Sequence, residues 1–408
     1  MYSLIKKIFN FNNQKTILCI PHVNCENDKY DIINYTGDNV LSYLHKLKDQ
    51  NTVLKKFNFI LVFYDETRRN LLLEYIDENF NNLNIKLLLK DNRKKFSFNW
   101  FKQEVILFLA QSKSKVILTS APYKMLIHFK FFGQKIFCLN YFTPFKNDYF
   151  EKNESGFKNF NIDVCFTTSK LASQITSISE RIEFSKFKVT GFPRNDVMLS
   201  PRFSKIEIYD KLGIAEDTNL ILYVPTHRDY EKNKTKDVRN VLGYGDLFNS
   251  NLSSLLENTN SVILVKLHPK QNNYVVHKSL IDRIIVYKQS YDLTLYDIMP
   301  YSKLLISDYS SVYFDYILTG GQVIFHFYDF NNYIKTRSLS YDPIESILNG
   351  EVCKTENEFI KSLSQLLNQN AVIENNNKLD LLFNKYNDGH SSIRITNHIE
   401  SSLSLKKI

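Results

Sequence analysis

The sequence has few cysteines, and their positions exclude two classes of protein. The chain has 408 residues but only five cysteines, which are odd in number and scattered. No two of them have the spacing of a zinc site or of a redox C-x-x-C pair. A disulfide-stapled secreted domain is therefore not expected, and reduced thiols in the cytosol are the expected state. The five are Cys19, Cys25, Cys138, Cys165 and Cys353.

The chain also lacks a long apolar run. No run reaches the length of about 18 residues that crosses a bilayer. The first residues, MYSLIKKIFNFNNQK, form a segment too short and too polar for a secretory signal. We therefore expect a cytoplasmic protein. The segment Leu4–Phe9, with Lys6 and Lys7, leaves open a peripheral contact with the inner face of the membrane, against the alternative of an ordinary first helix.

No internal repeat is present, and no nucleic-acid-binding pattern of the RRM, KH or helix-turn-helix type. What is present is a globular composition, with 43% hydrophobic and 23% charged residues, in a chain long enough for two domains. The net charge of +9 favours contact with a polyanion such as a membrane face or a phosphate-rich substrate. Without a recognition motif, we do not expect nucleic acid as a partner.

The most informative stretch runs from residue 296 to residue 333. Its apolar run Lys303–Ser307 has the size of a buried strand, and Gln322–Phe327 predicts a second strand. Between them a polar turn precedes a predicted helix over Val312–Leu318, for which Ser310 or Ser311 is a good N-cap. The order strand, turn, helix, strand is typical of half of a nucleotide-binding α/β unit.

This turn has the chemistry of a phosphate site. The first turn of a helix presents unpaired backbone N–H groups and the positive end of the helix dipole. The hydroxyls of Ser310 and Ser311 lie at the same end, and Asp308 directly follows the strand, where α/β folds bind ligands. An ordinary capped helix beside a solvated aspartate is the alternative.

Short apolar runs alternate with helical patterns along both halves of the chain, which predicts an α/β fold with covered parallel sheets. We expect two Rossmann-like lobes with a cleft between them, joined near Ser200–Glu207. The expected domains are residues 1–200, 201–385 and a C-terminal helix in 386–408. Expected strands are 16–21, 57–64, 85–89, 116–120, 136–140, 164–168, 187–190, 219–224, 261–267, 283–286, 303–307 and 322–327, and expected helices are 38–48, 66–79, 100–112, 170–179, 247–257, 312–318 and 356–366.

Several residues of the 296–333 stretch resemble the signature of a known protein family. They are Asp297, Pro300, Ser307, Asp308, Tyr309, Ser310, Ser311, Phe314, Asp315, Phe325, Tyr328, Asp329 and Tyr333. In this order they resemble the signature of the CDP-glycerol glycerophosphotransferase family, the teichoic-acid and capsule polyol-phosphate transferases. The resemblance implies a GT-B plan, with the acceptor on the first lobe and the nucleotide donor on the second, and it requires no metal or other cofactor.

Other motifs extend the resemblance into the donor site. Thr226 and Arg228 lie in a segment similar to the family's Y-A-P-T-[WF]-R, and a guanidinium there grips phosphate oxygens. Lys266 and His268 match K-x-H-P and share one face of a strand. His268 would hydrogen-bond the diphosphate or protonate the departing nucleotide. Arg337 matches Y-x-x-x-R and adds a further charge.

Two motifs concern the junction of the lobes. The segment Gly191–Asp196 is similar to G-x-P-R-[NV]-D and predicts a tight turn. Arg194 in it either reaches an anionic group in the cleft or pairs with an aspartate to hold the hinge. Near the C-terminus, Asp388–Arg394 resembles D-G-x-[AS]-[ST]-x-R-I, and Ser391 or Ser392 would cap a last helix that returns to the first lobe.

The first lobe departs from the family. Where the family has W-H-G-T-P-L-K, with the histidine as presumed base, this chain has N-Y-F-T-P-F-K. Thr143 matches and still shapes an acceptor pocket, but Tyr141 stands at the histidine position, and a neutral tyrosine is a poor base. Three explanations remain open. Another residue such as His128 or Asp148 is the base, the reaction needs only a weak base, or the activity is changed or absent.

The resulting hypothesis is a transferase that moves glycerol phosphate, or a related polyol phosphate, from a CDP-linked donor to a hydroxyl of a cell-surface glycopolymer, releasing CMP. The expected catalytic residues are His268 and Asp308. The expected partners are CDP-glycerol or a similar CDP-polyol and a glycopolymer or lipid-linked acceptor. The alternatives are a GT-B glycosyltransferase that uses a CMP- or UDP-sugar and an inactive scaffold of such a complex.

Overall fold

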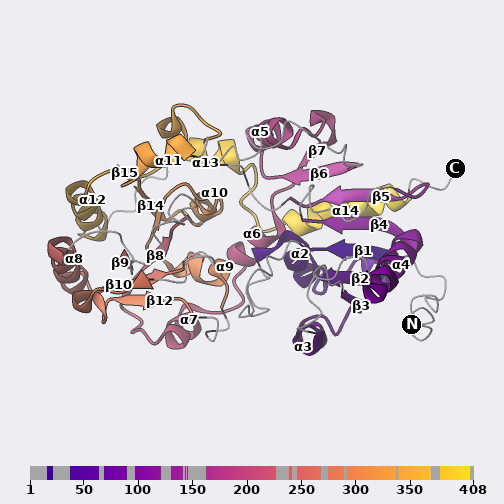
Figure 1. The fold of residues 1–408 in the computed structure, drawn as a ribbon, viewed down its shortest axis with the longest axis horizontal. Helices are drawn as coiled ribbons and strands as arrows, with labels where there is room; N and C mark the ends of the chain where they lie inside the picture. Colours follow the sequence, from indigo (N-terminus) through magenta and orange to yellow (C-terminus); the bar gives the residue numbers. More distant parts are fainter. Residues whose placement is uncertain are drawn as a thin grey trace. The chain divides into compact units, whose positions relative to one another are not determined.

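The computed structural model describes residues 16–21, 37–63, 69–89, 97–120, 130–140, 143, 145, 162–226, 239–240, 246–267, 274–288, 291, 293–336, 339–368 and 377–404. The chain divides into two compact units (Figure 1). Unit 1 comprises Met1–Tyr141, Gly156–Ser200 and Lys385–Ile408. Unit 2 comprises Phe142–Ser155 and Pro201–Asn384.

Unit 1 is built on a seven-stranded sheet of order β3-β2-β1-β4-β5-β6-β7. Every neighbouring pair of strands is parallel. Side chains alternate between the two faces, so that Leu18 and Cys19 belong to different buried clusters. Both faces are therefore covered, which explains why the strands are continuous apolar runs. The strands are Thr16–Ile20 (β1), Asn58–Phe63 (β2), Asn84–Leu89 (β3), Ser114–Thr119 (β4), Lys135–Cys138 (β5), Val164–Thr167 (β6) and Phe187–Val189 (β7).

Side chains satisfy the first N–H groups of several helices of unit 1. Asp38 caps the helix Asn39–Leu47 by accepting hydrogen bonds from Val40 N and Leu41 N at 2.8 and 3.0 Å. Ser97 and Ser169 cap two others in the same way. The helices are Asn39–Leu47 (α2), Arg69–Asn79 (α3), Phe98–Lys113 (α4), Lys170–Glu180 (α5), Pro193–Leu199 (α6) and Ser391–Ser404 (α14).

Unit 2 is built on a six-stranded parallel sheet of order β12-β10-β8-β13-β14-β15 (Figure 1). Its strands are Asn219–Val224 (β8), Ser261–Val265 (β10), Ile284–Val286 (β12), Leu304–Ser307 (β13), Gln322–His326 (β14) and Glu351–Cys353 (β15). Arg239–Asn240 (β9) and Tyr274–Val275 (β11) form a separate pair. The helices are Lys205–Leu212 (α7), Asp246–Asn258 (α8), Leu295–Ile298 (α9), Val312–Tyr316 (α10), Phe330–Thr336 (α11), Glu356–Asn368 (α12) and Asn377–Phe383 (α13).

The predicted α/β fold with two Rossmann-like lobes is confirmed, and each expected strand is present. Some local predictions were wrong. The expected tight turn at Gly191–Asp196 is the start of α6, because Pro193 occupies the first helical position, which its fixed φ suits. Unit 2 resumes at Pro201, within the range Ser200–Glu207 expected to join the lobes, and a capping box between Ser204 and Glu207 initiates α7 there.

The cap of α14 also differs from the expectation. Neither Ser391 nor Ser392 is the residue that caps this helix. The carboxylate of Asp196, on α6, accepts hydrogen bonds from Ser391 N at 2.9 Å and from Ser392 N at 2.7 Å. Asp196 is 1% exposed and lies 195 residues earlier in the chain than Ser391. The aspartate of the G-x-P-R-[NV]-D motif therefore fixes the C-terminal helix within unit 1.

Residues 142–155, which the expected boundary placed in the first domain, group with unit 2. The reason is visible at Phe145, which is 1% exposed. Its ring centroid lies 5.6 Å from that of Phe314 and 6.4 Å from that of Tyr341. Ser340 N donates a 3.1 Å hydrogen bond to Phe145 O. An apolar side chain buried among the aromatic rings of unit 2 attaches this segment there.

Candidate donor site at the carboxyl edge of the second sheet

The order of strands in unit 2 creates a topological switch point. From β8 the chain proceeds outward to β10 and β12, and it then returns to the other side of β8 as β13 before continuing to β14 and β15. The connections after β8 and after β13 therefore leave the carboxyl edge in opposite directions. Such a point is where open α/β sheets bind their ligands.

Thr226 and Asp308 meet at this switch point. Ser307, the last residue of β13, is in register with Val224, the last residue of β8. Beyond them, Thr226 N donates hydrogen bonds of 3.0 and 2.9 Å to Oδ1 and Oδ2 of Asp308, and Thr226 Oγ1 donates one of 2.5 Å to Oδ1. Asp308 is 1% exposed. The structure thus brings together two of the predicted site residues and fixes the start of the loop that follows β8.

Ser310 and Ser311 follow Asp308, but the helix behind them is shorter than predicted. α10 has five residues, and Ile317–Thr319 continues as a 3-10 helix. Ser310 Oγ accepts a 3.4 Å hydrogen bond from Val312 N, whereas the Ser311 side chain makes no capping bond. The dipole of so short a helix is small. An attraction for phosphate at this turn therefore rests on the two hydroxyl groups more than on the helix.

Aromatic residues of the same stretch pack against Tyr309, which belongs to this turn. Tyr309 is completely buried, with its ring centroid 3.6 Å from that of Tyr333 and 4.8 Å from that of Phe327. Its hydroxyl donates a 3.2 Å hydrogen bond to Asp329 Oδ1. Motif residues after β14 therefore hold Tyr309, and Tyr309 holds its neighbours Asp308 and Ser310 in place.

Lys266 lies one strand further along the same edge. It directly follows β10, and its backbone N donates a 2.9 Å hydrogen bond to Tyr223 O of β8. The Lys266 Nζ atom is 5.5 Å from the ring centroid of Tyr287, which follows β12. Burial lowers the pKa of the Lys266 ammonium from its ordinary value. A phosphate group beside this ammonium would favour its charged form.

Comparison with known proteins identifies the family. The sequence profile of CDP-glycerol:poly(glycerophosphate) glycerophosphotransferases matches residues 62–401. The chain belongs to this family.

Similar proteins include teichoic acid polymerases and primases. The chain is 28% identical over 222 residues to the teichoic acid ribitol-phosphate polymerase TarL of Staphylococcus aureus, covering 52% of this chain and 37% of that protein. It is 30% identical over 203 residues to the teichoic acid glycerol-phosphate primase of Bacillus subtilis, covering 50% of this chain and 49% of that protein. The matches thus span about half the length of these relatives or less.

Solved structures share the fold. A histidine-to-alanine variant of the wall teichoic acid polymerase TagF has a TM-score of 0.71 at 18% identity, covering 100% of this chain and 93% of that one. A TagF variant soaked with CDPG has a TM-score of 0.70 at 18% identity, with coverage of 99% and 93%. A putative UDP-N-acetylglucosamine 2-epimerase from Listeria monocytogenes has a TM-score of 0.57 at 15% identity, with coverage of 97% and 98%.

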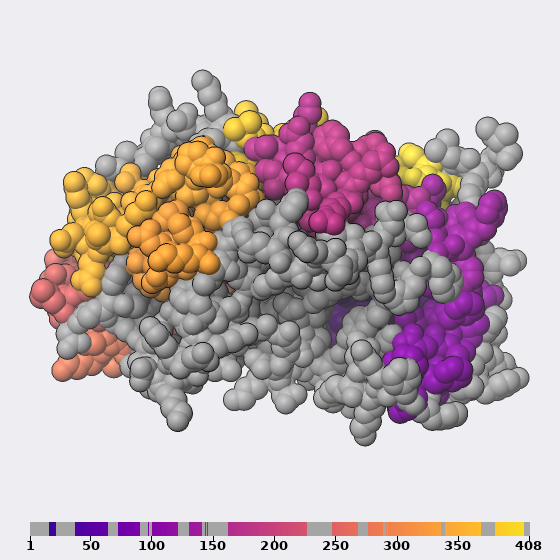
Figure 2. All heavy atoms as spheres, turned by 45° about the horizontal axis from the view of Figure 1, so that its top comes forward, coloured from indigo at the N-terminus to yellow at the C-terminus, as the bar shows by residue number. Residues whose placement is uncertain are grey.

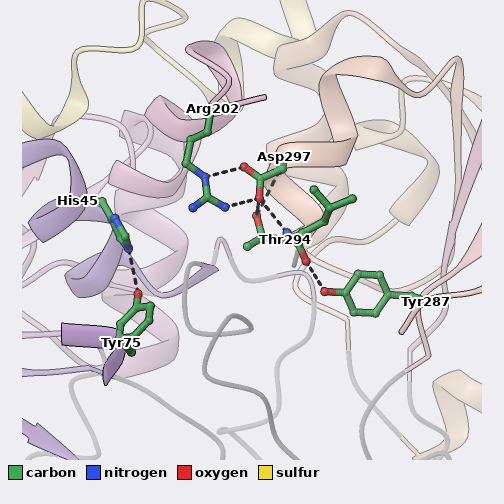
Figure 3. Close-up of polar contacts among 7 residues, drawn as sticks. His45, Tyr75, Arg202, Tyr287, Thr294 and Asp297 are labelled. Carbon is green, nitrogen blue, oxygen red and sulfur yellow. Dashed lines mark hydrogen bonds and ion pairs between the residues drawn. The ribbon is translucent and has the colours of Figure 1, made fainter. Parts of the chain in front are cut away.

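Sequence reasoning missed a hydrogen-bond network around Asp297, a residue of the glycerophosphotransferase signature (Figure 3). Arg202 donates to Asp297 through Nε at 2.9 Å and through Nη2 at 2.6 Å. Thr294 donates to Asp297 Oδ2 through its backbone N at 2.8 Å and its hydroxyl at 2.7 Å. The hydroxyl of Tyr287, whose ring centroid is 5.5 Å from Lys266 Nζ, donates a hydrogen bond to Leu293 O. The T-x-x-D spacing of a capping box was the available signal in the sequence.

The other predicted site residues divide into two groups. Arg194 belongs to α6 of unit 1, is 5% exposed, and donates from its backbone N to Asn39 Oδ1 at 3.2 Å. Its guanidinium carbon lies 5.1 Å from the ring centroid of Phe192. Thr143 belongs to unit 2 and is 2% exposed. The predictions for Tyr141, His128, Asp148, Arg228, His268 and Arg337 lie outside the described residues.

Among the residues that the structure describes, no group of three or more His, Cys, Asp or Glu side chains is arranged to hold a metal ion. No helix within the described ranges is long and apolar enough to cross a membrane.

Proposed function

We propose that this glycerophosphotransferase family member transfers glycerol phosphate, or a related polyol phosphate, from a CDP-linked donor to a hydroxyl of a cell-surface glycopolymer and releases CMP. Family membership supports the class of reaction. The observation that carries the proposal on this chain is the Thr226–Asp308 contact at the switch point of unit 2, because it prepares the edge where a nucleotide diphosphate binds.

The proposed roles at this edge follow from the contacts. Both oxygens of Asp308 are engaged by Thr226, so Asp308 acts by holding the loop after β8, which carries Arg228. Ser310 and Ser311 donate hydroxyl hydrogen bonds to phosphate oxygens, and Lys266 neutralises charge from the adjacent strand. In phosphoryl transfer, positioning and charge stabilisation supply most of the rate.

Two further basic residues complete the proposed donor site. Arg337 adds charge at the diphosphate, and His268 hydrogen-bonds or protonates the phosphate of the departing CMP. In this scheme His268 is the catalytic acid. Its pairing in the sequence with Lys266, two residues earlier, supports the assignment.

The acceptor side of the proposal uses the chain segment around Tyr141 and Thr143. We assign the acceptor hydroxyl to this segment, and we assign to Arg194 the binding of an anionic group of a substrate. The acceptor is a glycopolymer or a lipid-linked precursor of teichoic-acid or capsule type. The protein would meet it at the cytoplasmic face of the membrane through peripheral contact.

The test is incubation of the purified protein with CDP-glycerol and CDP-ribitol, with and without candidate acceptors, while CMP is measured. Release of CMP that depends on an acceptor is expected, and His268→Ala should abolish it without a change in the circular dichroism spectrum. Turnover of a CMP- or UDP-sugar in place of the CDP-polyols would favour the glycosyltransferase alternative. Binding of CDP without any turnover would favour a scaffold.

A further inference from the structure

Asn39 is the first residue of α2 and is completely buried in unit 1. α2 lies between β1 and β2 of a parallel sheet, so its first turn lies at the edge where the strands end. The backbone of this turn is fixed, because Asp38 accepts hydrogen bonds from two of its N–H groups. On the face drawn in Figure 2, little of the indigo part of the chain, which includes α2, is visible.

The side chain of Asn39 holds the backbone of two other segments at the same edge of the sheet. Its Nδ2 atom donates hydrogen bonds to Leu139 O at 3.3 Å and to Asn140 O at 2.8 Å, just after β5. Its Oδ1 atom accepts one of 3.2 Å from Arg194 N at the start of α6. One amide group therefore joins α2 to segments that are 100 and 155 residues away in the chain.

The chemistry of these contacts requires an amide at position 39. The two carbonyl groups need a donor, and the N–H of Arg194 needs an acceptor, so the orientation of the Asn39 amide is fixed by its partners. An aspartate has the same shape, but it would turn an oxygen toward both carbonyl oxygens. Since Asn39 is completely buried, the cost of losing the donor would be large.

The backbone of Asn140 has an unusual conformation that this contact supports. Its φ is +56°, in the left-handed region, and the residue is 2% exposed. Asparagine tolerates this region better than most residues, but such a conformation persists only where surrounding contacts hold it. Successive carbonyl groups of an extended strand point to opposite sides, whereas the carbonyls of Leu139 and Asn140 both reach the amide of Asn39. The chain therefore turns at Asn140, directly before Tyr141.

We propose that Asn39 is a positioning residue for the acceptor. It fixes the turn at Asn140, from which the segment with Tyr141 and Thr143 continues. It also fixes the backbone of Arg194, so one side chain sets the places from which both acceptor-side groups start. A displacement of about 1 Å in a reacting geometry costs about 100-fold in rate. The inference rests on the proposed function, in which this segment binds the acceptor hydroxyl and Arg194 binds an anionic group.

The test uses Asn39→Asp, which keeps the acceptor for Arg194 N and removes the donor to the two carbonyls. The matched control is Asn58→Asp. Asn58 is 1% exposed and begins β2 at the opposite edge of the same sheet, where it accepts a hydrogen bond from Asn84 Nδ2. Each substitution places one carboxyl group in a buried site, so the losses of stability, measured in urea, should be comparable.

Two kinetic and binding measurements separate positioning from general damage. They are kcat/KM for a glycerol-phosphate oligomer as acceptor probe, from CMP release, and the affinity for CDP, from calorimetry. We expect Asn39→Asp to lower the acceptor kcat/KM by about 30- to 100-fold and to change CDP affinity by less than about twofold. Asn58→Asp should leave both within about twofold of wild type.

A second variant removes the effect of charge. Asn39→Ser takes away the amide without adding a carboxylate, so repulsion of an anionic acceptor cannot explain its result. It should show the same selective loss of acceptor kcat/KM. It also keeps the test valid if Asn39→Asp does not fold.

Two results would overturn the inference: a variant of Asn39 with wild-type kcat/KM for the acceptor, or one that loses CDP affinity in the same proportion as activity. If the wild-type protein releases no CMP with any acceptor, the proposed function is refuted. Amide hydrogen exchange then decides the inference without turnover. The peptide that contains Leu139 and Asn140 should exchange faster in Asn39→Asp and not in Asn58→Asp, and unchanged exchange in Asn39→Asp would overturn the positioning role.

Discussion

Arg202 holds Asp297 through two hydrogen bonds, and the partners come from different parts of unit 2. Arg202 is the second residue of unit 2 after the chain leaves unit 1 at Ser200. Asp297 lies on α9, has a completely buried side chain, and also receives the capping hydrogen bonds of Thr294. The pair therefore connects the entry of the chain into unit 2 to α9, where the family signature begins.

This pair predicts a large loss of stability in Asp297→Asn. The amide replaces one acceptor oxygen with a donor that faces the Arg202 guanidinium, so the free energy of unfolding should fall by about 2–3 kcal/mol. Urea denaturation measures it. The control is Glu345→Gln, which alters the Lys354–Glu345 pair, whose side chains are 48% and 47% exposed. It should cost less than about 0.5 kcal/mol. Equal losses in the two variants would contradict a structural role for Asp297.

Gly191 predicts a second large loss, in Gly191→Ala. Its φ is +82°, and an added Cβ would overlap the Oγ atom of Ser391 at the start of α14. Gly213 provides the matched control, because its φ is +70° but an added Cβ would meet nothing within 4 Å. Gly213→Ala should cost about 1 kcal/mol for the backbone alone, and Gly191→Ala about 2 kcal/mol more. The difference in urea midpoint between the variants isolates the contact with α14, and no difference would refute it.

The Thr226–Asp308 contact predicts graded effects on the donor site. Thr226→Val removes one of the three hydrogen bonds to Asp308 and keeps the backbone N–H, so CDP affinity should fall by about tenfold or less. Asp308→Asn alters the acceptor of all three and should lower kcat/KM for the CDP-polyol by about 100-fold. Calorimetry with CDP and the CMP-release assay measure the two effects. An Asp308→Asn protein with wild-type affinity and turnover would separate this contact from the donor site.

Residue patterns were sufficient for the sheets and insufficient for contacts across long stretches of sequence. Buried parallel strands are apolar runs, so β8 and β13 could be predicted, and their carboxyl ends placed Thr226 and Asp308 at one edge. Asp196 gave no local signal that it would cap α14, because its partners are almost 200 residues away. β15 was missed because Glu351–Cys353 has an exposed glutamate and a half-buried valine before its one buried residue, so it forms no apolar run.

Glu180 predicts a dependence of stability on pH. This residue ends α5, is 3% exposed, and has a pKa raised to about 7 by burial. Its unfolded pKa is near 4.5, so the folded state binds more protons between these values. The contribution of Glu180 to the free energy of unfolding is present below about pH 4.5 and is lost as pH rises through about 7. Glu180→Gln should therefore raise the free energy of unfolding at pH 8 by about 2 kcal/mol and change it little at pH 4. Exposed Glu216→Gln is the control, and parallel pH profiles for wild type and Glu180→Gln would refute the assignment.

Lys266 predicts opposite effects of alkaline pH on stability and on donor binding. Burial lowers the pKa of its ammonium in the folded protein, so the unfolded chain binds more protons as pH rises toward the ordinary lysine value. Stability should rise with pH in that range, whereas CDP affinity should fall because the amine loses the charge that attracts phosphate. Calorimetry with CDP between neutral pH and about pH 10 tests this.

Two variants provide the comparison. Lys266→Met should bind CDP weakly, with little change in affinity over this pH range. Lys361→Met, at an exposed position on α12, should follow the wild-type curve. If Lys266→Met kept the wild-type decline in affinity, another group would be responsible for it.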